Sequence, residues 1–272
     1  YYAYRYIKNM VPPGPTPRYL SVGTVVHAAV EALHRGDQLD EVTKTLEESF
    51  DTLVEERADE REKELCLKDK EWAVHMLPVY YEKICNGRYG WKVVAAVEEE
   101  MWLCLLRGER SVYIVGKPDL VVVGKNEKLR HVQIKTLSTR VDPSYFATQQ
   151  TFSLHEVVYG FMIEGTFGEQ LDMPYQGTEL VMLNKVMRPT EPANRTKDGR
   201  MTDYYERQLK KYELDQKHWA ERVVDRRFLA MGYTWRREAL LELADSIMAM
   251  FAMESGHRPY VRAGGNACHQ YG

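Results

Sequence analysis

Apolar residues recur at helical spacing in the first third of the chain and change to strand-like runs after residue 86. This pattern predicts a helix over 23–34 that ends at Arg35-Gly36, followed by further helix over 39–85. The charged run 55–64 is typical of a solvated helix face. Four consecutive strands are then predicted, over 92–106, 111–115, 119–123 and 130–136.

The second half of the chain mixes the two patterns. We expect an amphipathic helix over 143–164, a strand over 179–186, a polar loop over 188–200 and helices over most of 204–254. This order predicts an α/β fold with a central mixed sheet flanked by helices. We expect a single domain over 1–272, with a helical insertion at about 39–86 and a helical C-terminal part at about 204–254.

Composition narrows the class of protein without identifying it. The net charge is −3 over 272 residues, which does not indicate a dedicated nucleic-acid binder but suits an enzyme with a local basic cleft. No run approaches the ~18 apolar residues of a membrane span, and no signal segment opens the chain. Its four cysteines form no C-x-x-C pair, which argues against a zinc ribbon or a disulfide framework. We therefore expect a cytoplasmic protein with no membrane partner.

Candidate catalytic and metal-binding residues lie on two neighbouring predicted strands. Asp119 heads the first strand, and the second carries Gln133 and Lys135, which share a face because they are two residues apart. If the strands pair antiparallel, Asp119 approaches the same face. A carboxylate, an amide oxygen and an ammonium suit a divalent metal and a phosphoryl centre. The alternative is an unrelated α/β scaffold, in which Asp119 and Lys135 lie apart with no pocket between them.

Several short motifs occur in a recognisable order. They are Gly23-x-x-x-His27-x-x-x-Glu31, Glu98-Glu-Glu100 on the strand before Gly116, Pro118-Asp119, Gln133-Ile134-Lys135-Thr136, and His155-x-x-x-Tyr159. The ordered set resembles the PD-(D/E)XK nuclease superfamily, and in particular its RecB-like branch, which includes CRISPR-associated RecB-like exonucleases and phage exonucleases. The resemblance covers roughly residues 1–272.

The resemblance implies a restriction-endonuclease-like core and a metal-dependent DNA nuclease, in particular an exonuclease of recombination, repair or phage DNA metabolism. Its substrate would be DNA that is single-stranded or has free ends. Mg²⁺ or Mn²⁺ would be held by His27, Asp119, Gln133 and the Ile134 carbonyl, with Glu31 and Glu98 as further ligands or supports. Lys135 would position the attacking water and stabilise the phosphate. Substrate contacts would come from Thr136, Gln150, His155, Tyr159, Arg188, Arg195 and Lys197.

This chain departs from the family in two respects. Position 133 is Gln, where the motif normally has an acid, so the site loses one negative charge. Gln133 is a natural variant of an active enzyme, an engineered inactivating change, or a mark of a degenerate site in a DNA-binding or assembly subunit. We favour the first, because Lys135, Asp119 and His27 are intact. RecB-like relatives often bind an iron–sulfur cluster, but only Cys268 lies near the expected C-terminal positions, so the cysteines do not support a cluster.

Overall fold

The computed structural model describes residues 18–86, 91–107, 111–138, 141–150, 153–186, 200–230 and 232–254. The strands are β1 (Trp91–Val97), β2 (Met101–Leu106), β3 (Val112–Gly116), β4 (Leu120–Gly124), β5 (Leu129–Leu137), β6 (Tyr175–Asn184) and β7 (Val224–Ala230). The α-helices are α1 (Arg18–Arg35), α2 (Leu39–Glu55), α3 (Glu60–Tyr80), α4 (Pro143–Gln150), α5 (Leu154–Ile163), α6 (Glu169–Leu171), α7 (Arg200–Lys217), α8 (Trp219–Arg222) and α9 (Tyr233–Glu254). Short π-helical turns, η2 (Tyr81–Cys85) and η3 (Glu164–Gly168), extend α3 and α5.

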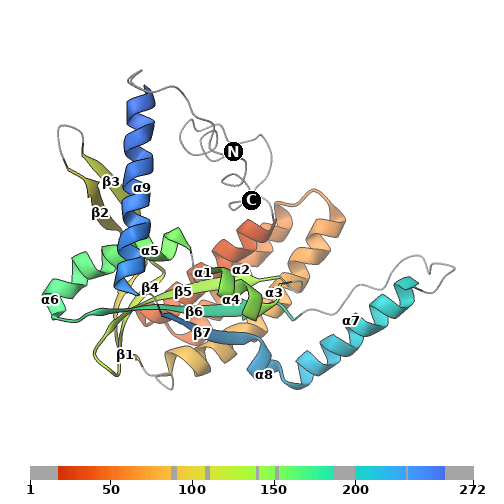
Figure 1. The fold of residues 1–272 in the computed structure, drawn as a ribbon. Coiled ribbons are helices and arrows are strands. Elements are labelled where there is room, and N and C mark those ends of the chain that lie inside the picture. Colours follow the sequence, from red (N-terminus) through yellow and green to blue (C-terminus); the bar gives the residue numbers. More distant parts are fainter. Residues whose placement is uncertain are drawn as a thin grey trace.

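A five-stranded mixed sheet forms the centre of the fold, in the order β1-β4-β5-β6-β7 (Figure 1). Only β5 and β6 pair in parallel; the other neighbours are antiparallel. Strands β2 and β3 form a separate antiparallel pair. The predicted α/β class with a central mixed sheet is therefore confirmed.

Successive side chains of a strand point to opposite sides of the sheet, and helices pack on both of the resulting faces. Leu120, Val122 and Ile134 pack with α1, α2 and α3 in one apolar core. Val121 and Val123 pack with α5 and part of α9 in a second core on the other face. Strand β4 is buried along its whole length, as its unbroken apolar sequence requires.

The structure corrects the predicted elements in three places. The predicted strand 92–106 is broken at Glu98, which takes a left-handed conformation with φ of 48° between β1 and β2. The predicted helix 143–164 is two helices, α4 and α5. The predicted helical region 204–254 contains strand β7, which pairs with β6. No helix in the described ranges is long and apolar enough to cross a membrane.

Candidate metal centre

Helix α1 carries the first residues of the site. Its Val22, Val26 and Val30 are fully buried against the sheet, which fixes the rotation of the helix. His27 lies beside this apolar stripe, half-buried. Glu31, one turn later, forms an ion pair with Arg35 and borders the same cavity as His27.

Asp119 lies at the open edge of β5. Pairing between β4 and β5 ends at Leu120 and Val132, although β5 continues to Leu137 alongside β6. Beyond that point the backbone N–H of Ile134 donates to Asp119 Oδ2 at 2.6 Å instead of to a neighbouring strand. The same carboxylate oxygen lies 3.9 Å from His27 Nδ1. The fork between the two strands therefore holds the carboxylate in a fixed position facing α1.

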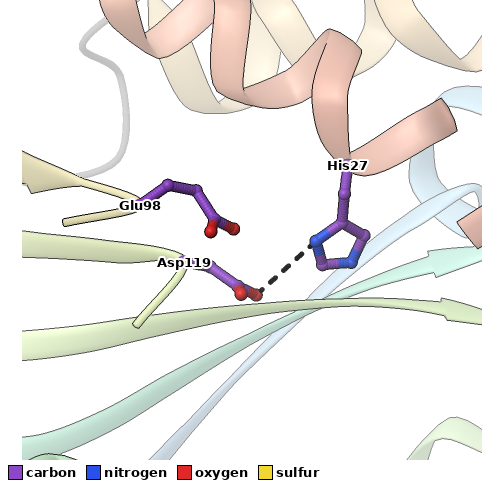
Figure 2. Close-up of side chains that lie close together, drawn as sticks. All are labelled: His27, Glu98 and Asp119. Carbon is purple, nitrogen blue, oxygen red and sulfur yellow. Dashed lines mark ion pairs between the residues drawn. The ribbon is translucent and has the colours of Figure 1, made fainter. Parts of the chain in front are cut away.

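Glu98 completes a cluster that could hold a metal ion. One ligand atom from each of His27, Glu98 and Asp119 lies within 4.8 Å of the others (Figure 2). The left-handed bend that ends β1 is anchored by the Glu98 backbone N–H, which donates to the Asp119 carbonyl at 3.1 Å. Burial, and then the nearby Asp119 carboxylate, raises the pKa of Glu98. Glu99 and Glu100 are exposed, so only the first of the three glutamates takes part.

The electrostatics of His27 suit a neutral metal ligand. Burial lowers its pKa most strongly, and the Lys135 ammonium lowers it further, while Asp119 and a hydrogen bond to the Ile134 backbone act in the opposite direction. The imidazole is therefore neutral at neutral pH, which is the form that ligates metals. The same backbone contact places Ile134 beside His27.

Gln133 lies on the opposite strand from Asp119. Continuing the β4–β5 register by one residue pairs the two positions. The Gln133 side chain is buried, its Nε2 lies 3.3 Å from His155 Nδ1, and its Oε1 has no hydrogen-bond partner among the described residues. A buried oxygen without a partner is costly unless a ligand satisfies it. The imidazole and the two carboxylates of His27, Glu98 and Asp119 form a donor set that fits Mg²⁺ or Mn²⁺.

Lys135 borders a cavity of about 900 Å³ together with His27 and Glu98 of the cluster. It is lined by Tyr19, Leu20, Gly23, Thr24, His27, Ala28, Glu31, Glu98, Lys135, Thr136, Ser138 and Lys185. The scaffold alternative predicted that Asp119 and Lys135 would lie apart with no pocket. The cavity is present beside Lys135, and the Asp119 carboxylate and the Lys135 ammonium both act on the pKa of His27. This arrangement speaks against the alternative.

The expected substrate-contacting residues fall into four groups. Thr136 lines the cavity. His155 and Tyr159 instead support the site from α5: their rings lie 4.1 Å apart, and the Tyr159 hydroxyl donates to the Lys117 carbonyl at 3.1 Å. Gln150 ends α4 and is not among the cavity residues. Arg188, Arg195, Lys197 and Cys268 lie outside the described residues.

Three features of the cavity were not predicted from the sequence: the lining residues Tyr19 and Ser138, and the contact that anchors Lys185. The Lys185 ammonium lies 2.9 Å from Asp69, a fully buried carboxylate that also contacts Arg18. Asp69 lies between Lys68 and Lys70 in a charged stretch of α3, so nothing in the sequence pattern marks it as buried. Tyr19 could have been found by extending the helical face of His27 back by two turns.

No curated protein matches the chain. Among solved structures, the chain is similar to a protein from Eubacterium rectale that is provisionally named an exonuclease, with 11% identity and a TM-score of 0.45 over 98% of this chain and 78% of that one. The sequence profile of the PD-(D/E)XK nuclease superfamily matches residues 1–235. The chain therefore belongs to the PD-(D/E)XK nuclease superfamily.

Proposed function

We propose that the protein is a divalent-metal-dependent deoxyribonuclease of the RecB-like branch that hydrolyses phosphodiester bonds from DNA ends in the cytoplasm. One observation carries this proposal. His27, Glu98 and Asp119 place ligand atoms within 4.8 Å of one another, and His27 and Glu98 line the cavity that Lys135 also borders. Two carboxylates, a neutral imidazole and an ammonium in one cavity are suited to a metal ion and a phosphate.

The metal would be held by His27, Glu98 and Asp119, with Gln133 Oε1 and the Ile134 carbonyl as further oxygen donors. A nitrogen ligand favours Mn²⁺ over Mg²⁺ in the general order of affinities. When bound, the ion would polarise the scissile phosphate and lower the pKa of the attacking water. The hydrogen bond from Ile134 N–H keeps Asp119 in place before any metal arrives.

Lys135 would act on the phosphate itself. It follows Ile134 on the open edge of β5 and borders the cavity beside His27. An ammonium in this position stabilises the negative charge that grows on the phosphate oxygens and orients the water for attack. Its side chain donates hydrogen bonds but accepts none, so it complements the acids that hold the cation.

A second candidate function rests on Gln133. An amide supplies an oxygen but no negative charge, so metal affinity is lower than with an acid at this position. A subunit that binds DNA without cutting it would fit this loss. The intact His27, Asp119 and Lys135 favour the active enzyme.

Cleavage of end-labelled single- and double-stranded DNA with Mg²⁺, Mn²⁺ or EDTA tests the proposal. Metal-dependent products that vanish in Lys135→Ala support the nuclease. Cleavage that appears only in Gln133→Glu would favour the inactive subunit, and cleavage that survives in Lys135→Ala would point to a contaminating enzyme.

A further inference from the structure

The cavity beside the metal centre is larger than an ion and one phosphate require. It holds about 900 Å³ and follows one face of α1 from Tyr19 to Glu31. That stretch of helix is about 18 Å long at a rise of ~1.5 Å per residue. Ligands of Mg²⁺ or Ca²⁺ lie within about 2.6 Å of the ion, so most of the groove serves something else. At a stacked spacing of ~3.4 Å, it has room for several nucleotides.

The end of the groove away from the cluster exposes an aromatic ring. Tyr19 is 68% exposed and Leu20 is 39% exposed, although both border the cavity. His27 and the two acids occupy the other end. Eight residues of helix separate Tyr19 from His27, a distance of about 12 Å along the axis. The aromatic ring is therefore too far away to touch the metal but is close enough to contact a strand held there.

The lining residues that come from the ends of β5 and β6 carry hydroxyl and ammonium groups. Thr136 and Ser138 follow Lys135 along and just beyond β5, and Lys185 follows the end of β6. Lys185 is anchored, because its ammonium lies 2.9 Å from the buried Asp69 and its backbone N–H donates to the Leu137 carbonyl at 3.0 Å. Such donors bind backbone phosphates and carry no preference for base sequence.

From this arrangement we propose that the groove binds an unpaired nucleic-acid strand, with Tyr19 stacked on a base and Lys185 contacting a backbone phosphate. The inference rests on the proposed nuclease function and specifies its substrate class. Inside a duplex each base is covered by its stacked neighbours, so away from the duplex ends a side-chain ring can stack only on an unpaired base. The stacked base lies about two to four nucleotides from the scissile phosphate, given the ~12 Å separation.

The test combines protein variants with strands that lack one base. The variants are Tyr19→Ala, the conservative Tyr19→Phe, and Tyr113→Ala as a control, because Tyr113 is 53% exposed on β3 outside the groove. The substrates are single strands with one abasic site at successive positions from the end, and a blunt duplex. Fluorescence anisotropy in EDTA measures strand binding, and cleavage with Mn²⁺ gives kcat and KM separately.

We expect Tyr19→Ala to weaken single-strand binding by about 5- to 150-fold, the loss of one stacked base, and to raise KM more than it lowers kcat. Tyr19→Phe and Tyr113→Ala should bind normally. One abasic position should weaken binding by the unmodified protein but have no further effect in Tyr19→Ala. Normal binding by Tyr19→Ala, or equal abasic losses in both proteins, would overturn the stacking role.

Separate outcomes test the nuclease activity and the binding of a strand in the groove. Metal-dependent cleavage without any coupling between Tyr19 and an abasic position would leave the nuclease standing and overturn the groove assignment. The coupled binding pattern without cleavage by any variant would support the groove and overturn the nuclease.

Discussion

The acids of the metal centre should destabilise the protein when no cation is present. Glu98 and Asp119 place carboxylate oxygens within 4.8 Å of each other. At an effective dielectric constant of ~20, two such charges repel by about 3.5 kcal/mol. The Lys117 ammonium, 3.8 Å from Glu98, and the surrounding water offset part of this repulsion. A net cost of about 1–2 kcal/mol remains, in line with the raised pKa of Glu98.

Replacing Glu98 with Gln should therefore stabilise the metal-free protein by about 1–2 kcal/mol at pH 7. Because the pKa of Glu98 is raised in the folded state, stability falls as pH rises from about 4.5 through the folded pKa, and the variant should lack this decline. Mn²⁺ at ~100 times its Kd should stabilise the unmodified protein by about 2.7 kcal/mol, and the variant by much less.

Urea denaturation followed by tryptophan fluorescence, in EDTA and in Mn²⁺, measures both effects. Glu99→Gln is the matched control, since Glu99 is the exposed neighbour outside the cluster and should change neither value. A Glu98→Gln variant that is less stable than the unmodified protein in EDTA, and that Mn²⁺ stabilises to the same extent, would refute this reasoning.

Four other perturbations follow from the structure. Gln133→Glu should tighten Mn²⁺ binding on the order of tenfold by adding a charge. His155→Ala should weaken Mn²⁺ binding by about ten- to a hundredfold in the otherwise unmodified chain, because the imidazole orients the Gln133 amide. In the Gln133→Glu background the same change should have little effect, because the two carboxylate oxygens are equivalent. Equal losses of Mn²⁺ affinity in both backgrounds, measured by calorimetry, would contradict this. Gly116→Ala should lower the free energy of unfolding by about 1–3 kcal/mol, because the new Cβ would lie 2.4 Å from Tyr159 Cε1. An unchanged urea midpoint would count against that packing. Burial lowers the pKa of His34 to about 4 in the folded protein, so as pH drops the histidine is protonated first in the unfolded chain. The free energy of unfolding should therefore fall between pH ~6.5 and 4, by at most about 3 kcal/mol. His34→Gln should flatten that fall in denaturation curves, and an unchanged slope would exclude His34 as its cause.

The sequence was sufficient to place the strand pair that carries the motif. Apolar runs bounded by a short charged turn predict strands at 119–123 and 130–136, and a short turn leaves little freedom of register. The antiparallel register of β4 and β5, continued by one residue, brings position 119 opposite position 133. His27 could also be placed, because helical spacing from the buried valines sets the direction in which it points.

Other features depend on contacts that no local pattern contains. Glu98 joins the cluster only because the chain turns into a left-handed bend after β1, where its backbone bonds to Asp119. Strand β7 was predicted as helix, since it is short, charged and flanked by helices. It is a strand because it pairs with β6, where Arg226 contacts the buried Glu179. The contact between Gln133 and His155 joins two elements and is likewise absent from the local pattern.

The most direct measurement is a Mn²⁺ titration of one protein sample by calorimetry, with the rate of DNA cleavage recorded at the same metal concentrations. The account predicts that binding and cleavage saturate together and that Asp119→Asn loses both. Cleavage that saturates without binding at this centre, or Mn²⁺ binding that survives in Asp119→Asn, would contradict it.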